Sequence, residues 1–163
     1  MKQQPAENKN YKLVKAKLFI IGLIAIALAA CSKDQFSTKP QLTFKSVNDT
    51  SFVQRQLMTF KIDFTDKEGD IQDTLWVQKI SFTCSDGDFT SGYQVPDFTA
   101  TKNLQGQFEI NYVYNASDGG YPSINACPTA ARVDSCYFRF WLKDKGNHIS
   151  DTVRSPVIKL LAQ

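Results

Sequence analysis

Short runs in which apolar and polar residues alternate are the feature that most constrains the fold of this chain. A period of two puts the apolar side chains on one face of an extended strand. The alternation is clearest at residues 58–64, 108–114 and 138–142. No stretch longer than about seven residues has the spacing of an amphipathic helix. The pattern predicts strands in which the following residues face a core: Leu42, Phe44, Met58, Phe60, Ile62, Phe64, Trp76, Ile80, Phe82, Phe108, Ile110, Tyr112, Tyr114, Phe138, Phe140 and Leu142.

Residues that favour tight turns separate these runs, at 68–70, 85–88, 117–120 and 145–147. A last run at 152–161 completes a set of about six or seven antiparallel strands. Strands that are apolar on one face predict a β-sandwich, so we expect an all-β fold. A length of 163 residues allows one such domain plus an appendage.

The net charge of +3 is misleading about the folded part of the chain. Residues 1–30 hold five of the 19 basic side chains and one of the 16 acidic ones, which leaves 14 basic and 15 acidic side chains in residues 31–163. Without an excess of positive charge, binding to nucleic acid through phosphate contacts is not expected. The one histidine, His148, lacks zinc spacing or a nucleophile motif around it, so we expect a bystander and no enzyme.

The N-terminus has the composition of an export signal. Lysines precede residues 18–30, which are 13 uncharged and almost wholly apolar residues. Such a run is shorter than the ~20 residues of a spanning helix and is typical of a secretory signal. It ends in Leu28-Ala29-Ala30-Cys31, which resembles the lipobox of bacterial lipoproteins. The resemblance implies removal of residues 1–30 and acyl chains on Cys31, which would anchor the protein to a membrane.

Two alternatives remain for this segment: an ordinary signal peptide with an incidental cysteine, and a retained membrane anchor. The polar residues 31–39 are expected to form a tether before a domain at residues 40–163. By comparison with enterobacterial sorting signals, Ser32 implies the outer membrane. Residues 32–34 resemble the signal that sends Bacteroidetes-type lipoproteins to the cell surface. The sequence does not determine whether the domain faces the periplasm or the exterior.

Two further segments resemble small immunoglobulin-like lipoproteins of the Bacteroidetes type. They are the turn Thr65-Asp-Lys-Glu-Gly-Asp-Ile71 and the segment Phe140-Trp-Leu-Lys-Asp-Lys-Gly-Asn147, which precedes a last strand that contains proline. With the lipobox, the likeness spans most of residues 31–163. It implies a single immunoglobulin-like antiparallel β-sandwich of about seven strands. It implies no particular ligand.

Three cysteines remain besides Cys31, and the oxidising envelope favours a disulfide. Cys127 and Cys136 lie on either side of a loop with eight residues between them, so we expect these two to pair. Cys84 with Cys136 is the alternative, because both share the core parity of their strands. An unpaired Cys84 would be an inert thiol, since no basic residue flanks it.

The acidic turn after residue 65 is the best candidate for an ion site. Calcium takes six to eight oxygen ligands, and Asp66, Glu68 and Asp70 offer alternate carboxylates. Asp144 joins them if its loop lies at the same end of the sandwich. The spacing departs from that of an EF-hand, and a solvated turn would explain the same residues. A structural Ca²⁺ here is the one cofactor that the sequence suggests.

Two aromatic residues fall on the polar side of their strand. Tyr137 and Trp141 share a face with Arg139 and Lys143. Such a face could stack on sugar rings or form a protein interface, and a covering loop at 120–134 is the alternative.

Two tripeptides, Asp73-Thr-Leu75 and Asp151-Thr-Val153, resemble the O-glycosylation sites of Bacteroidetes, with Thr74 and Thr152 as acceptors. The start of a strand is the alternative interpretation of both.

Together these features predict a membrane-anchored envelope lipoprotein, held by the lipid on Cys31. We expect a non-enzymatic binding or accessory module for a protein or glycan partner. The alternative is a structural or assembly lipoprotein without a ligand, which a wholly polar domain surface would favour.

Overall fold

The computed structural model describes residues 36–116, 120–127 and 133–162. The chain divides into two units, Met1–Gln35 and Phe36–Gln163, and all that follows concerns the second. The expected signal peptide and Cys31 lie outside the described residues. Of the expected tether, residues 36–39 are described, and they contact the domain: the Ser37 carbonyl accepts a hydrogen bond from the Lys67 N–H at 3.1 Å.

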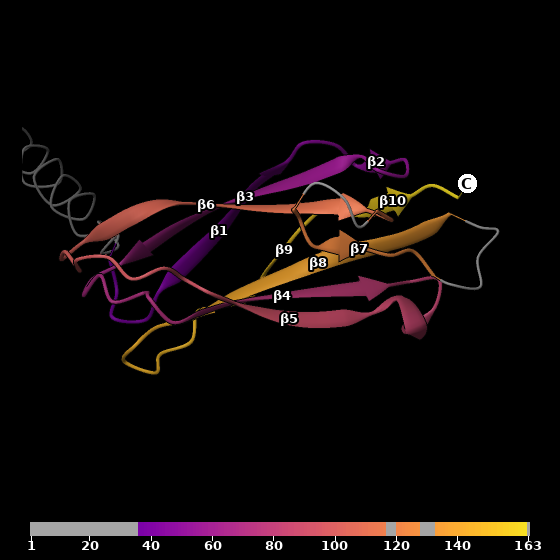
Figure 1. Ribbon diagram of the computed structural model, residues 1–163. Coiled ribbons are helices and arrows are strands. Elements are labelled where there is room, and N and C mark those ends of the chain that lie inside the picture. The colour runs from indigo at the N-terminus through magenta and orange to yellow at the C-terminus, as the bar shows by residue number, and fades with distance from the viewer. Residues whose placement is uncertain (1–35, 117–119, 128–132, 163) are drawn as a thin grey trace, which may run out of the picture. The chain divides into compact units, whose positions relative to one another are not determined.

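The second unit is all-β, as predicted, with two sheets packed face to face (Figure 1). The first sheet has the order β1 (Gln41–Val47), β3 (Leu57–Asp66), β6 (Leu104–Tyr114) and β7 (Ser123–Ile124). The second has the order β2 (Ser51–Phe52), β10 (Ile158–Leu160), β8 (Asp134–Lys143), β4 (Thr74–Ser81) and β5 (Phe89–Gln94), and β9 (Val153–Arg154) also pairs with β8. A short 3₁₀ turn, η1 (Ser85–Gly87), connects β4 to β5.

The core lies between the sheets and is rich in aromatic rings. The Phe60 ring of β3 is 4.8 Å from that of Phe138 and 5.2 Å from that of Phe140, both on β8. Strand alternation puts these side chains inside because every second residue of each strand faces the opposite sheet. The predicted inward parity of β3 and β8 is therefore confirmed.

The strands are more numerous than expected, and not all pairings are antiparallel. Short parallel pairings join β2 to β10 and β7 to β6. The single strand expected at residues 152–161 is divided into β9 and β10, with Pro156 between them. Proline has no N–H to donate to a sheet, which accounts for the interruption.

The predicted parity of β4 is wrong. Leu75, Val77 and Lys79 face the core, so Trp76 and Ile80 lie on the outer side of the sheet. Both sets contain apolar residues, and the sequence pattern favoured the bulkier set. Lys79 belongs to the set that faces the core, and a charged residue is not expected on the inner side of a strand.

Lys79 is tolerated in the core because its ammonium group has a complete set of partners. The side chain is fully buried. Its Nζ donates to Asp134 Oδ2 at 2.7 Å, to the Gly87 carbonyl at 2.9 Å and to the Asn125 carbonyl at 3.0 Å. These are three acceptors for three N–H donors, so no donor is left unsatisfied. The other Asp134 oxygen accepts the Ser81 hydroxyl at 2.5 Å.

Removing the lysine alone leaves a buried carboxylate without its cation. We expect Lys79→Met to lower the free energy of unfolding by about 3–5 kcal/mol, measured by urea denaturation. Lys145 serves as the control, because its ion pair with Asp97 is exposed. Lys145→Met is expected to cost about 1 kcal/mol or less. Equal losses from the two variants would contradict this account of the core.

Candidate functional site

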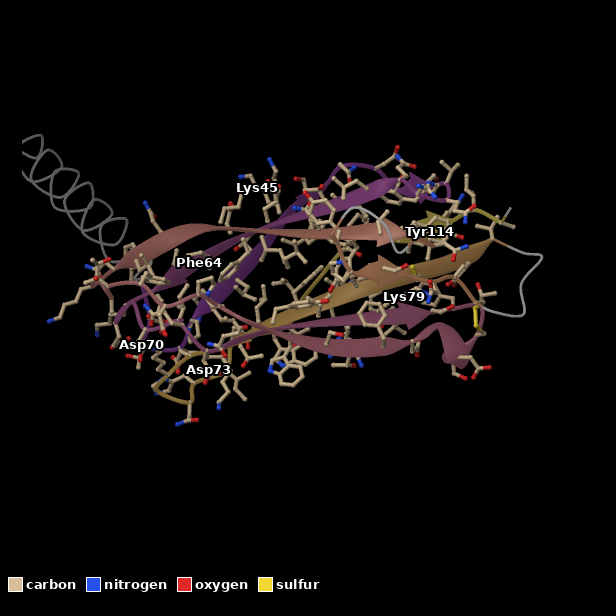
Figure 2. All side chains as sticks on the ribbon, in the orientation of Figure 1. Lys45, Phe64, Asp70, Asp73, Lys79 and Tyr114 are labelled. Carbon is tan, nitrogen blue, oxygen red and sulfur yellow. A yellow bond between two sulfur atoms is a disulfide. The ribbon has the colours of Figure 1, made fainter. Side chains whose placement is uncertain are left out.

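A turn at the end of β3 gathers acidic side chains at one end of the sandwich. Asp66 Oδ2 accepts the Gly69 N–H at 2.6 Å and the Asp70 N–H at 3.3 Å. Gly69 has a positive φ of 76°, and a Cβ there would lie 2.1 Å from the Thr101 carbonyl oxygen. Only glycine fits this position, so the turn returns the chain with Asp70 beside Asp66. Asp70 lies at the end of the domain opposite Lys79 and Tyr114 (Figure 2).

Asp144 reaches the same place from the segment after β8. The Lys145 N–H donates to the Asp70 carbonyl at 2.9 Å, which holds the two segments together. Carboxylate oxygens of Asp66, Asp70 and Asp144 all lie within 4.8 Å of one another. We call these three residues the acidic cluster. The sequence analysis made the inclusion of Asp144 conditional on its loop lying at this end, and the structure meets that condition.

Two oxygens of the acidic cluster are buried and have no hydrogen-bond donor: Asp66 Oδ1 and Asp70 Oδ1. Asp66 and Asp144 are fully buried. Burial raises the pKa of the Asp66 carboxyl, the charges of Asp70 and Asp144 raise it further, and the two turn N–H groups act in the opposite direction. No lysine or arginine forms an ion pair with the cluster within the described part of the chain. Within the described residues, the one basic side chain that is paired with the cluster is His148, whose Nδ1 lies 3.0 Å from Asp144 Oδ2.

Glu68, the fourth expected ligand, lies outside the cluster. Its side chain is exposed and accepts a hydrogen bond from the Thr38 hydroxyl at 3.2 Å. His148 instead contacts the cluster from outside: its Nδ1 lies 3.0 Å from Asp144 Oδ2, and its N–H donates to Asp144 Oδ1 at 2.7 Å. The Ser150 hydroxyl accepts a hydrogen bond from the Leu142 N–H and donates one to the Asp151 carbonyl.

The outer side of the second sheet carries a row of aromatic side chains. Trp76 and Trp141 are cross-strand partners whose rings stack at 6.0 Å with an interplanar angle of 7°. The Tyr137 ring lies 5.4 Å from the Phe82 ring and is tilted by 33° against it, and Phe82 is 64% exposed. We call Trp76, Phe82, Tyr137, Arg139 and Trp141 the aromatic face. Tyr137 and Trp141 lie on this side as the sequence indicated, whereas Trp76 and Phe82 were expected in the core.

Two arginines lie directly opposite each other at the aromatic face. Arg139 of β8 is in register with Arg154 of β9. Like charges in this arrangement repel each other. Within the described residues, neither guanidinium group has an ion pair with an acid. Lys143, on the same side of β8, is paired with Asp73 at 3.4 Å.

The described part of the loop expected over this face joins the other sheet. Ser123 and Ile124 form β7, which pairs with β6, and the Asn125 carbonyl accepts from Lys79 between the sheets. A pocket of about 340 Å³ lies between β5 and β6, and its apolar lining includes Tyr93, Val95, Phe108, Ile110 and Tyr121. The sequence analysis did not find it, because it depends on two strand edges that do not pair.

The two proposed glycosylation sites differ in their surroundings. Thr74 is half-buried at the start of β4, and its hydroxyl donates to Asp73 Oδ1 at 2.7 Å. Thr152 is exposed just before β9. Modification at either position stays a prediction, and the exposure of Thr152 favours it over Thr74.

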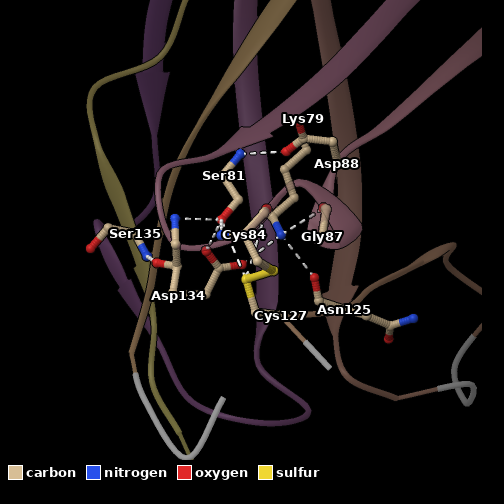
Figure 3. The surroundings of a disulfide bond; sticks show 10 residues. Lys79, Ser81, Cys84, Gly87, Asp88, Asn125, Cys127, Asp134 and Ser135 are labelled. Atoms are coloured by element: carbon tan, nitrogen blue, oxygen red, sulfur yellow. Dashed lines mark hydrogen bonds and ion pairs between the residues drawn. A yellow bond between two sulfur atoms is a disulfide. The ribbon is translucent and has the colours of Figure 1, made fainter. Parts of the chain in front are cut away.

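The predicted disulfide between Cys127 and Cys136 is wrong. The bond joins Cys84 to Cys127, and Cys136 is a free, buried thiol (Figure 3). Cys136 lies within β8 with its side chain in the core, in register with Ile158, which keeps it away from Cys127. The alternative pairing of Cys84 with Cys136 is wrong for the same reason. Burial raises the pKa of the Cys136 thiol to about 12, so it is protonated at neutral pH.

Within the described residues, no helix is long and apolar enough to cross a membrane.

No family model matches the chain, and no curated protein matches it. Among solved structures, it is similar to the sporulation control protein Spo0M from Bacillus subtilis, with a TM-score of 0.43, 12% identity and 77% of this chain covered. The chain spans 50% of that protein's length. It is also similar to a Niemann-Pick type C2 protein from the Japanese carpenter ant, with a TM-score of 0.40, 7% identity, and coverage of 78% of this chain and 97% of that one. These similarities are too distant to inform function.

The pairing of the cysteines can be tested directly. Non-reducing peptide mapping is expected to link Cys84 to Cys127, and iodoacetamide at pH 8 is expected to alkylate Cys136 only after denaturation. The bond closes a loop with a sequence separation of 43 residues. Reduction should therefore lower the free energy of unfolding by about 4 kcal/mol. A linked peptide that contains Cys136 would contradict the structure.

Proposed function

We propose that this protein is a bacterial envelope lipoprotein, anchored by acyl chains on Cys31, whose immunoglobulin-like domain is a non-enzymatic binding module. The aromatic face is the observation that carries the proposal. A domain with only a positional role needs no row of half-buried tryptophan and tyrosine on the outer side of a sheet, beside two arginines that have no ion pair with an acid among the described residues. The sheet orders support the immunoglobulin-like assignment. In one sheet β1, β3 and β6 are neighbours, like strands A, B and E of an immunoglobulin domain. In the other sheet β10, β8, β4 and β5 are neighbours, like strands G, F, C and C′.

The chemistry of the aromatic face favours a protein partner that carries acidic groups. Tryptophan, tyrosine and arginine are the residues most enriched at protein interfaces and among those that dominate binding energy. Arg139 and Arg154 face each other and have no ion pair with an acid among the described residues, so a carboxylate from the partner would relieve their repulsion. A glycan that stacks on the tryptophans is the competing occupant, and the experiment below separates the two.

The anchor has its own test. Replacement of the lipobox cysteine, Cys31→Ser, removes the thiol that accepts the lipid. We expect this variant to lose incorporation of a labelled fatty acid and to leave the membrane fraction, because a single acyl chain or none does not anchor a protein stably. Cys136→Ser is the matched control, since Cys136 is buried in the domain. Continued labelling of Cys31→Ser would contradict lipidation at this position.

The partner is tested with the natively acylated full chain, by crosslinking in cells and mass spectrometry of what is recovered. We expect wild type to recover one envelope protein in near-stoichiometric amount. Trp141→Ala should weaken its binding about 30-fold, the effect of losing an interface residue worth about 2 kcal/mol. Arg154→Glu should also weaken it, because the charge then repels an acidic partner.

Lys61→Glu provides the control for charge. Lys61 is exposed on β3 of the opposite sheet, so the same change in charge is made away from the aromatic face. Loss of the partner from Lys61→Glu as well as from Arg154→Glu would contradict a specific site. Glycan-array binding that Trp141→Ala abolishes would show a glycan module, and no partner of either kind would favour the structural alternative.

A further inference from the structure

We propose that the acidic cluster of Asp66, Asp70 and Asp144 is a calcium site. The proposal goes beyond the partner-binding role, and it depends neither on the aromatic face nor on the lipid anchor. It starts from the convergence of three carboxylates from two separate segments, whose oxygens lie within 4.8 Å of one another. Asp66 is the last residue of β3 in the first sheet and Asp70 lies in the turn after it, whereas Asp144 follows β8 of the second sheet.

Two oxygens of the acidic cluster lack the hydrogen bonds that buried carboxylates normally have. Asp66 Oδ1 and Asp70 Oδ1 are buried and receive no hydrogen bond. A buried carboxylate oxygen without a donor or cation costs free energy, so native proteins rarely keep one. Asp66 is fully buried, and its second oxygen is already held by the Gly69 and Asp70 N–H groups. The free oxygen is therefore the one available to a ligand.

No lysine or arginine of the described residues forms an ion pair with the cluster. The two lysines at the end of β8 and just after it use other acids: Lys143 pairs with Asp73, and Lys145 pairs with Asp97. His148 contacts Asp144, a fully buried member of the cluster, through Nδ1. A ligating carboxylate is commonly oriented by such a neighbouring hydrogen bond. A divalent cation would offset the repulsion among the three carboxylates, with which no lysine or arginine of the described residues forms an ion pair.

The donor set fits calcium better than other common ions. All the donors in the cluster are oxygens, whereas zinc prefers cysteine and histidine. Magnesium demands near-ideal octahedral geometry, which loops from two sheets are poorly suited to impose. Calcium accepts irregular sets of carboxylates completed by water, and extracellular modules bind it with Kd values of about 10⁻⁴–10⁻³ M.

Calcium at this position would join the two sheets at one end of the sandwich. It would bind the β3 turn and the segment after β8 to the same ion. The β3 turn also contacts the beginning of the described chain, through Lys67 to Ser37 and Glu68 to Thr38. Calcium would thus stabilise the end of the domain where the described chain starts.

The test uses the full chain, purified in detergent and treated with a chelator. Calorimetric titration with CaCl₂ is expected to show one ion bound per chain. The melting temperature should rise by about 10 °C when the free calcium concentration is about 100 times the Kd, because the ion binds only the folded state. MgCl₂ at the same concentration should give a much smaller shift.

Three variants locate the site. Asp66→Asn should abolish both the heat of binding and the shift in melting temperature, and it should unfold no earlier than wild type in chelator, because it removes a repelling charge. Asp70→Asn provides the same test at a half-buried position, where folding is less sensitive. Glu68→Gln removes a carboxylate from the same turn but outside the cluster, so it should keep the full response.

A melting temperature of wild type that is equal in chelator and in millimolar calcium, with no heat of binding, overturns the proposal. An equal shift with magnesium overturns the choice of calcium. Loss of the response in Glu68→Gln but not in Asp66→Asn overturns the location of the site.

Discussion

The buried ion pair between Lys79 and Asp134 is the interaction on which the rest of the domain depends. It holds Lys79 on the inner side of β4, and strand alternation then puts Trp76 and Ile80 on the outer side. A shift of one residue would exchange every side chain between the two faces. The position of one lysine therefore puts Trp76 of β4 on the same outer side as Tyr137 and Trp141 of β8. The same ammonium group also holds the Gly87 and Asn125 carbonyls, close to the disulfide (Figure 3).

The two ends of the sandwich differ in how their buried charges are paired. At the Lys79 end, a buried cation meets a buried anion and two carbonyls, so the charges and the hydrogen-bond donors are both satisfied. At the Asp70 end, Asp66, Asp70 and Asp144 bring negative charges together and leave two buried oxygens without a donor. The two buried oxygens without a donor at the second end are the observation on which our proposal of a calcium site rests.

The three cysteines show how topology overrides sequence distance. Cys127 and Cys136 are close in the chain, but β8 begins between them and carries Cys136 into the core. Cys84 is far from Cys127 in sequence, and the η1 turn brings it within 6.0 Å, measured between the Cα atoms. The disulfide therefore joins the β4–β5 connection to the segment after β7 and supports the side chains around Lys79.

The sequence by itself determined the all-β class, the inward parity of β3 and β8 and the acidic turn, because alternation and turn chemistry are local properties of a chain. It could not decide the parity of β4, where both faces are apolar and only the partner of Lys79 distinguishes them. It could not decide the disulfide or the place of Asp144 beside Asp66, since both depend on which loops meet at one end. Those contacts join residues far apart in sequence, and only the packing of the two sheets brings them together.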